Sequence, residues 1–377
     1  MQAFPPQPLP PWSRAVLKVG SSLLAGDGGL EAGHARALAG FIDAAQARGR
    51  EVVLVSSGAV AAGRARVPAA GNGLVQRQAL AALGQAALIG FWQALSPRPV
   101  AQVLLTHDDL RHRRRYLNAR TALQELLRLG ALPVINENDT VAVDELKLGD
   151  NDNLAAAVAS LVGADLLLIA TDIAGLYSGH PGRDPQAQPV PEVAAVTPAV
   201  LAMAGPPGRL GTGGMRTKLE AAAKAAAAGI PTALFCGRDP QAVAALAQER
   251  LHGTLVRAAP VRINARKQWL RHAPAAGRLH VDAGAAAALA RGASLLPGGL
   301  RAVEGEFRRG DVVELLGPDG GLLARGQAQY NAVECARLAG RHSREIEALL
   351  GYRYDDVLIH RDDLVQVAAA SPDPEEA

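Results

Sequence analysis

Hydrophobic and polar positions follow two different periods along the first 257 residues of this 377-residue chain. Short aliphatic runs, typical of buried strands, alternate with longer stretches in which hydrophobic residues recur at helical spacing. The stretch 31–48, for example, places Leu38, Phe41, Ile42 and Ala45 on one helix face. Six runs are predicted strands: Ala15–Val19, Glu51–Val55, Val100–Leu105, Leu132–Ile135, Leu166–Ala170 and Thr232–Phe235. This alternation predicts an α/β fold with an open, mainly parallel sheet flanked by helices.

From residue 278 the pattern changes to shorter strands separated by turn residues. We expect a strand over 279–282, an alanine-rich helix over 283–291 and a further strand over 312–316. Short strands with this turn chemistry predict a small β-barrel-like second domain. The predicted organisation is a disordered leader 1–12, a first domain 13–260, a linker 261–277, the second domain 278–368 and a disordered tail 369–377.

The interior must be aliphatic, because hydrophobic residues make up 49% of the chain and aromatic residues only 3%. The two cysteines, Cys236 and Cys335, are far apart in the sequence, and neither has a His or Cys at metal-ligand spacing. The sequence therefore indicates neither a disulfide framework nor a zinc site. The proline-rich start does not resemble a signal peptide, and no apolar run approaches the ~18 residues that cross a bilayer. These features predict a cytoplasmic protein with no membrane partner.

Charge is distributed unevenly along the chain. From residue 278 onward, 11 arginines and no lysine stand against 16 Asp plus Glu, whereas the first 277 residues have 28 basic and 20 acidic side chains. The first part therefore suits an anionic substrate, and the second part would repel nucleic acid.

Only five of the 39 basic residues are lysine, and two of these, Lys18 and Lys218, stand in glycine-rich loops. A lysine beside bare backbone indicates a compact positive charge placed against phosphate.

Polar residues follow four of the predicted strands directly. They occupy Lys18–Ser22, Ser56–Gly58, Asn136–Thr140 and Thr171–Asp172. Ligands of open α/β sheets bind outside the carboxyl ends of the strands, so we expect these four loops to form a single site.

The loop that ends at Lys218 lacks the Walker A pattern, because Thr217 stands where that motif requires glycine. Gly211, Gly213 and Gly214 instead leave backbone N–H groups open to phosphate oxygens. A helix is predicted over 210–228, and its positive end near Met215 points the same way. The sequence thus predicts a phosphate site of another kind.

Taken in order, six motifs resemble those of the glutamate 5-kinases of the amino acid kinase family. They are Lys18-Val-Gly-Ser-Ser22, Ser56-Ser-Gly-Ala59, Val134-Ile-Asn-Glu-Asn-Asp139, Gly149-Asp-Asn-Asp-Asn-Leu154, Thr171-Asp172 with Gly175-Leu-Tyr177, and Gly211-Thr-Gly-Gly-Met-Arg-Thr-Lys218. The C-terminal unit is similar to a PUA domain, on Ser294-Leu-Leu-Pro-Gly298 and on Gly305, Phe307, Gly310 and Asp311. The resemblance covers nearly the whole chain.

The resemblance implies phosphoryl transfer from ATP to the γ-carboxylate of L-glutamate, which gives γ-glutamyl phosphate, the first step of proline biosynthesis. It gives the catalytic roles to Lys18 and Lys218, with Asp152 orienting both ammonium groups. An aspartate between two lysines also favours their charged forms. The alternative for Asp152 is a helix N-cap ahead of the stretch 154–161. ATP and Mg²⁺ are the implied cofactors, and no protein ligand of the metal is assigned.

The remaining site residues follow from the same resemblance. Substrate recognition is carried over to Ser57, Asp139 and Asn151, with Asp139 binding the α-ammonium of glutamate. Asn136, Asn138 and Asn153 are interpreted as loop builders. ATP binding is carried over to Lys18, Thr171, Asp172, Thr212, Gly213, Gly214, Met215, Arg216, Thr217 and Lys218. Arg216 stands where the family often has a small residue.

Two alternative functions stay open at this point. One is another amino acid kinase, for acetylglutamate or aspartate. The other, from a different class, is an RNA-binding protein acting through its PUA-like unit, which the acidic balance and the few aromatic residues disfavour. The implied partners are γ-glutamyl phosphate reductase, further copies of the chain in a homo-oligomer, and proline as a feedback inhibitor.

Overall fold

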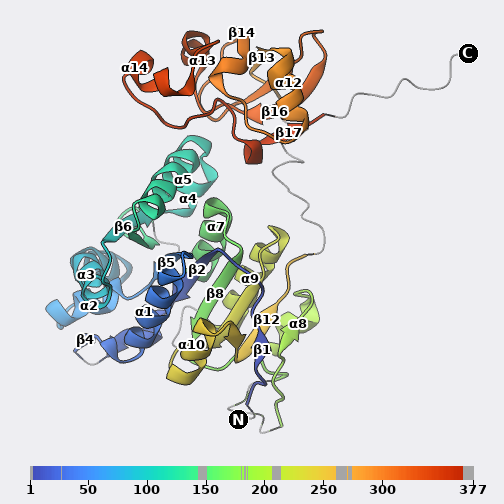
Figure 1. The fold of residues 1–377 in the computed structure, drawn as a ribbon. Coiled ribbons are helices and arrows are strands. Elements are labelled where there is room, and N and C mark those ends of the chain that lie inside the picture. The colour runs from blue at the N-terminus through green and yellow to red at the C-terminus, as the bar shows by residue number, and fades with distance from the viewer. Residues whose placement is uncertain are drawn as a thin grey trace, which may run out of the picture. The chain divides into compact units, whose positions relative to one another are not determined.

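The computed structural model describes residues 3–26, 28–142, 151–179, 181, 184, 186–205, 214–259, 270 and 274–367. The chain separates into two compact units, Met1–Arg262 and Ile263–Ala377 (Figure 1). Most of the predicted linker 261–277 and the whole predicted tail 369–377 lie outside the described residues.

An eight-stranded sheet forms the centre of the first unit, in the order β6-β7-β5-β2-β8-β10-β12-β9 (Figure 1). The first six strands of this order run parallel, β12 is antiparallel to β10, and β9 is parallel to β12. The strands are β2 Arg14–Val19, β5 Glu51–Ser56, β6 Val100–Leu105, β7 Leu132–Glu137, β8 Leu166–Thr171, β9 Glu192–Val193, β10 Thr232–Cys236 and β12 Gly253–Val256. All six predicted strands are present, which confirms the mainly parallel α/β sheet.

Helices cover both faces of this sheet. Side chains of α1 (Ala32–Ala47), α3 (Leu74–Leu95) and α10 (Pro240–Ala247) share one core with Leu17 and Val19 of β2. Side chains of α5 (Arg113–Arg128), α7 (Asn151–Val162) and α9 (Met215–Ala227) share the other core with Val16. Successive residues of a strand point to opposite faces, so Lys18 is on the side of Val16, where α7 and α9 pack.

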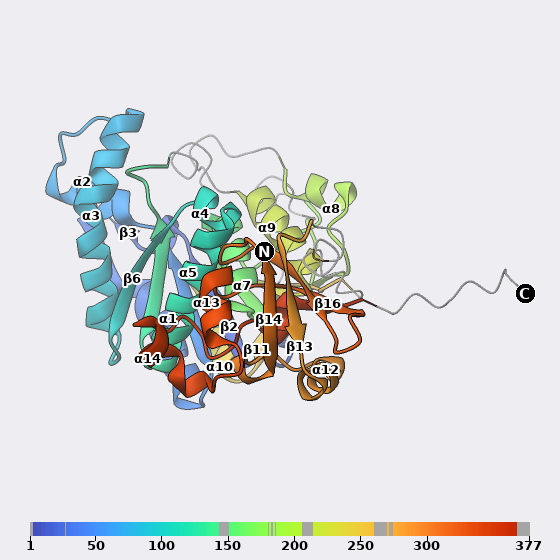
Figure 2. The ribbon, with the colours of Figure 1, turned by 90° about the horizontal axis from the view of Figure 1, so that it is seen from above.

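Helix α3 packs against α2 (Ala59–Arg66) at very short range. A Cβ atom on Gly63 would lie 1.9 Å from the Leu80 carbonyl oxygen, and one on Gly84 would lie 1.9 Å from that of Ala59. Glycine is therefore required at both positions for the two backbones to approach this closely. Figure 2 shows the two helices side by side at one end of the sheet.

The N-terminal segment differs from the prediction of a disordered leader over 1–12. Within its described residues 3–12, β1 (Gln7–Pro8) pairs antiparallel with β11 (Arg250–Leu251). Phe4, Leu9 and Trp12 are buried, and the Phe4 ring packs edge-on against Tyr177 with centroids 5.2 Å apart. The prolines rule out a helix but not an extended strand, and the hydrophobic residues between them supply the burial that orders it.

Shorter elements complete the first unit. They are β3 Ala25–Gly26, β4 Gly29–Leu30, α4 His107–Arg111 and α8 Pro198–Met203, with a 3₁₀ turn at Ser21–Leu23. None of the helices in the described part of the chain is long and apolar enough to span a membrane.

The second unit is built on a five-stranded sheet in the order β14-β13-β15-β16-β17, where only the β13–β15 pair is parallel. Its elements are β13 Gly277–Val281, α12 Ala283–Ala290, β14 Leu300–Gly305, β15 Val312–Leu316, β16 Leu322–Gln327, α13 Ala332–Leu338, α14 Ile346–Leu350 and β17 Leu364–Gln366. Leu279, Leu315, Tyr330 and Cys335 are fully buried in a core of its own. The predicted small β domain is present.

Candidate active site

Four neighbouring strands of the first sheet end beside one another at the same edge. In the order β7-β5-β2-β8, their carboxyl ends bring together Asn136, Ser57, Lys18 and Thr171. Gly58, with φ 116°, turns the chain directly after Ser57 into α2, a backbone conformation that an L side chain would strain. The loops that sequence analysis expected to converge therefore do so.

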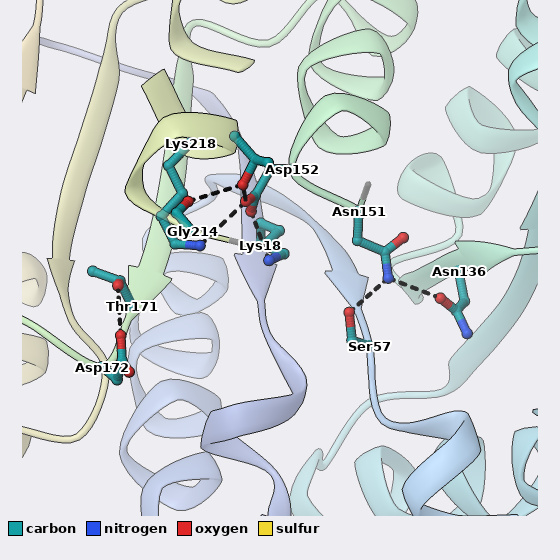
Figure 3. Close-up of polar contacts among 10 residues, drawn as sticks. Lys18, Ser57, Asn136, Asn151, Asp152, Thr171, Asp172, Gly214 and Lys218 are labelled. Atoms are coloured by element: carbon teal, nitrogen blue, oxygen red, sulfur yellow. Dashed lines mark hydrogen bonds and ion pairs between the residues drawn. The ribbon is translucent and has the colours of Figure 1, made fainter. Parts of the chain in front are cut away.

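The two glycine-loop lysines contact one carboxylate (Figure 3). Lys18 Nζ lies 2.6 Å from Asp152 Oδ1, and Lys218 Nζ lies 3.2 Å from Asp152 Oδ2. Asp152 is fully buried, and the two lysines are 5% and 8% exposed. Thr217 Oγ1 lies 2.8 Å from Asp152 Oδ2 and 2.9 Å from the carbonyl oxygen of Gly214. Two positive charges are thus held side by side in a nearly dry environment.

The interpretation of Asp152 as a helix N-cap is wrong. Asp152 is the second residue of α7, already inside the helix, and its carboxylate is directed at the lysines and Thr217. A carboxylate in the first turn of a helix is also favoured by the helix dipole. The helix therefore supports the ionised form of Asp152 without being capped by it.

Burial and charge compete in setting the protonation of this cluster. Burial alone would raise the pKa of Asp152, but the charges of Lys18 and Lys218 and the hydrogen bonds outweigh it and lower the pKa to about 2. The pKa of Lys218 is lowered, because burial and the charge of Lys18 together exceed the opposing effect of Asp152. We expected Asp152 to favour the charged form of both lysines. The charge of Asp152 does raise the pKa of Lys218, but by less than burial lowers it.

A chain of side-chain amides runs from the lysine cluster toward α3. The Asn151 amide donates to Ser57 Oγ at 2.7 Å and to Asn136 Oδ1 at 3.1 Å (Figure 3). The Asn136 amide in turn donates to Gln85 Oε1 at 3.0 Å. Asn136, Asn151 and Gln85 are all buried, so each hydrogen bond fixes the orientation of the next side chain.

Asp139 follows β7 and is 6% exposed. Its Oδ1 atom is buried and has no hydrogen-bond partner among the residues that the structure describes. Burial and the charge of Glu137 raise the pKa of Asp139 to about 7, against the opposing charge of Arg77. An acidic side chain held this way gains a great deal from a cationic ligand, which would restore its ionised form.

The residues that sequence analysis expected to bind the nucleotide divide into three groups. Thr171 Oγ1 donates to Asp172 Oδ1 at 3.2 Å (Figure 3), and the negative charge of Asp172 acts on Lys218. Gly214, Met215 and Thr217 lie at the start of α9, whereas Arg216 is turned outward and pairs with Glu220, at 3.0 Å from Nε to Oε1. Thr212 and Gly213 lie outside the described residues.

Sequence reasoning missed two members of the amide chain. Asn136 was interpreted as a loop builder, but it is a residue of β7 with its side chain buried in the site. Gln85 was not considered, although one signal was available: a polar side chain among the buried, mostly apolar positions of helix α3. Asn153 is likewise more than a loop residue, because its Oδ1 accepts from Lys224 Nζ at 2.5 Å. Asn138 does serve a turn, where its Oδ1 accepts from Thr140 Oγ1 at 2.6 Å.

The described residues offer no protein cage for a metal ion. Within them, no three His, Cys, Asp or Glu side chains are grouped as a metal site. Asp152, the carboxylate nearest the lysines, has both oxygens engaged by ammonium groups.

Comparison with known proteins shows the family of the chain. The sequence matches the amino acid kinase family over residues 13–236 and the PUA domain over residues 277–350. It is 66% identical to the glutamate 5-kinase of Xanthomonas oryzae pv. oryzae (strain KACC10331 / KXO85), over 93% of this chain and 99% of that protein. It is 62% identical to the glutamate 5-kinase of Xylella fastidiosa (strain M12), over 96% and 97%. A solved UMP kinase from Bacillus anthracis is 15% identical with a TM-score of 0.45, over 66% of this chain and 97% of that chain. The chain belongs to the amino acid kinase family and, within it, to the glutamate 5-kinases.

Proposed function

We propose that this chain transfers the γ-phosphoryl group of ATP to the γ-carboxylate of L-glutamate, as the first step toward proline, and that Lys18, Asp152 and Lys218 carry the transfer. The single observation behind the assignment of residues is that both lysines contact the same buried carboxylate. The relatives at 62–66% identity, which are glutamate 5-kinases, support the choice of substrate. Acetylglutamate or aspartate kinase activity and RNA binding as the main function are not favoured.

The chemistry needs no proton transfer. A glutamate γ-carboxylate with an ordinary pKa near 4.3 is roughly 99.8% ionised at pH 7, so it requires no general base. One of its oxygens forms the new bond to the γ-phosphorus while the bond to the β,γ-bridging oxygen breaks. That oxygen leaves with the electron pair as part of ADP. The obstacle is the repulsion between two anions.

Lys18 and Lys218 reduce that repulsion with their positive charges. In the loose transition state, negative charge spreads over the transferring oxygens, and cations fixed beforehand stabilise it without reorganising. Asp152 holds the two ammonium groups together against their own repulsion. Because the three groups are nearly dry, their interaction with phosphoryl oxygens is stronger than it would be in water.

The residues proposed to bind the acceptor, glutamate, follow β5 and β7 or begin α7. Asp139 supplies a carboxylate for the α-ammonium of glutamate. Ser57 and Asn151 supply uncharged polar groups, which can bind carboxylate oxygens without competing with the lysines for the phosphoryl group. Asn136 and Gln85 act through Asn151, by fixing its amide.

The nucleotide side combines Thr171, Asp172 and the glycine-rich segment Thr212–Lys218. The start of α9 directs backbone N–H groups and the positive end of the helix dipole at phosphate. Mg²⁺ would enter bound to the phosphates of ATP, as is usual for this ion, and would neutralise part of their charge.

The proposed activity is tested by ATP turnover with hydroxylamine present, which traps an acyl phosphate as a hydroxamate. We expect a signal with glutamate at least about 100-fold above those with aspartate and N-acetylglutamate. Aspartate is one methylene shorter, and N-acetylglutamate has no α-ammonium for Asp139. Equal turnover of N-acetylglutamate would contradict the assignment of the substrate. A gel shift with structured RNA at moderate salt tests the alternative class.

Asp139 predicts a pH dependence of glutamate binding. Since its pKa is about 7 without a ligand, kcat/KM for glutamate should fall about tenfold per pH unit below pH 7, as Asp139 becomes protonated. In Asp139→Asn this acid limb should disappear, and KM for glutamate at pH 8 should rise by about 10–100-fold. The raised pKa also predicts how stability depends on pH. The folded protein favours protonated Asp139, so its free energy of unfolding falls as pH rises from about 4 to 7. Asp139→Asn should therefore not lower Tm at pH 8. An acid limb that persists in the variant would exclude Asp139 as its source.

Further aspects of the proposal concern partners and location. The acyl phosphate product hydrolyses readily, which favours direct delivery to a γ-glutamyl phosphate reductase. We also propose a homo-oligomeric, cytoplasmic enzyme that proline inhibits. Light scattering gives the assembly mass, and the hydroxamate assay with added proline measures inhibition. The proposed boundaries are a kinase domain over 13–260 and a PUA domain over 278–368.

A further inference from the structure

The first turn of α3 adjoins the Asp139 loop. Gln78 Nε2 donates to the backbone carbonyl oxygen of Asp139 at 2.9 Å, which ties the helix to the loop after β7. Arg77, the preceding residue of the same turn, exerts its positive charge on the Asp139 carboxylate. An arginine and an aspartate from different elements are therefore neighbours at the acceptor side of the site.

Each of these two side chains has a buried polar atom without a hydrogen bond. Arg77 Nε and Asp139 Oδ1 are both inaccessible to water, and neither has a partner in the described parts of the chain. No ion pair joins the two residues to each other within the same parts. Buried donors and acceptors are almost always satisfied, so a donor and an acceptor left open on two adjoining elements indicate a ligand with both kinds of group.

An α-amino acid carries those groups on one carbon atom. Glutamate has three charges, of which the γ-carboxylate meets the phosphoryl group beside the lysine cluster and the α-ammonium is assigned to Asp139. The α-carboxylate still needs a cationic partner, because Ser57 and Asn151 are uncharged. The planar guanidinium of Arg77 offers parallel N–H donors that match the two oxygens of a carboxylate.

We propose, on the basis of the proposed function, that Arg77 binds the α-carboxylate of glutamate and that Arg77 and Asp139 together recognise the amino acid end of the acceptor. The lysines at positions 18 and 218 then act only on the end that is phosphorylated. Helix α3 thereby contributes both a binding residue, Arg77, and a positioning residue, Gln85, to the acceptor site.

The test compares glutamate with 4-aminobutyrate, which is glutamate without its α-carboxylate. In Arg77→Met, kcat/KM for glutamate should fall about 10–100-fold, mainly through KM, while kcat/KM for 4-aminobutyrate and KM for ATP stay within about twofold. Arg77→Lys should recover part of the preference for glutamate, because it keeps the charge but not the planar fork. Arg66→Met, an exposed arginine at the end of the neighbouring helix α2, is the matched control and should behave as wild type.

An equal loss with both acceptors, or an unchanged preference for glutamate, would overturn the assignment of Arg77. Melting temperatures of all variants identify a folding defect, and Arg77→Gln serves as the second variant if the methionine variant does not fold. Calorimetric titration with glutamate and 4-aminobutyrate measures the same preference without turnover. A wild-type protein that binds glutamate through Arg77 but yields no hydroxamate would refute the proposed reaction and leave this inference standing.

Discussion

Replacing Lys218 with alanine is expected to lower kcat by at least about 100-fold while the protein stays folded. The size of the loss follows from removing one fixed positive charge from a site where charge spreads in the transition state. The fold should survive because the ammonium group of Lys218 is itself costly to bury, as its lowered pKa indicates. Asp152 also keeps Lys18 as a partner at 2.6 Å. Hydroxamate formation and a thermal melt measure the two effects.

Two further variants make this expectation specific. Lys224→Ala, on the same helix α9, removes an ammonium group that contacts Asn153, and it should keep kcat within a few-fold of wild type. Lys218→Arg restores a positive charge, but a broad planar group cannot replace a compact one in a space where Lys218 is 8% exposed. We therefore expect it to recover little activity. Full activity in Lys218→Ala, or in Lys218→Arg, would refute the proposed role.

The fold of the first unit was largely predictable because its strands are buried on both faces. Such strands are continuous aliphatic runs, and β2 and β8 show this clearly, with all but one of their residues buried. The order of the strands was not predictable, since it depends on pairing between distant segments. The leader was predicted wrongly because composition alone does not show that Phe4, Leu9 and Trp12 have a surface to pack against.

The candidate site was predictable where its residues end a strand or begin a helix. Lys18, Ser57 and Thr171 were found because polar residues directly after an aliphatic run are conspicuous. Gln85 and Arg77 were not predicted as site residues, because a residue of α3 reaches the site only through the packing of α3 on α2. Gly63 and Gly84 make that packing possible. That packing is a tertiary property, and the spacing along the chain does not reveal it.

Replacing Asp152 with asparagine is expected to damage both stability and catalysis, by one mechanism. The substitution keeps the shape but leaves two buried ammonium groups without a counter-charge, and breaking a buried ion pair in this way costs about 3–5 kcal/mol. Asp152 is also the main influence that raises the pKa of Lys218 against burial. Without it, that pKa falls further, and Lys218 loses its proton at a lower pH.

The pH profile separates this mechanism from a simple loss of packing. In Asp152→Asn, the alkaline limb of kcat should move to lower pH by about one unit or more, and activity should recover partly as pH falls. Stability should change too. The pKa of Asp152, about 2 against the ordinary value of 3.8, stabilises the wild type by about 2 kcal/mol above pH 4, and this contribution disappears as pH falls toward 2. The variant should lack that acid dependence.

Asp165 provides the matched control for this experiment. It accepts hydrogen bonds from the backbone N–H groups of Ser13 and Arg14 at the opposite end of β2, at 2.8 and 3.0 Å. Asp165→Asn should lower Tm without moving the alkaline limb of kcat, because it leaves the charges around Lys218 unchanged. If both variants shift the limb equally, or neither does, Asp152 does not set the protonation of Lys218. The lysine pair would then have to keep its charge by other means.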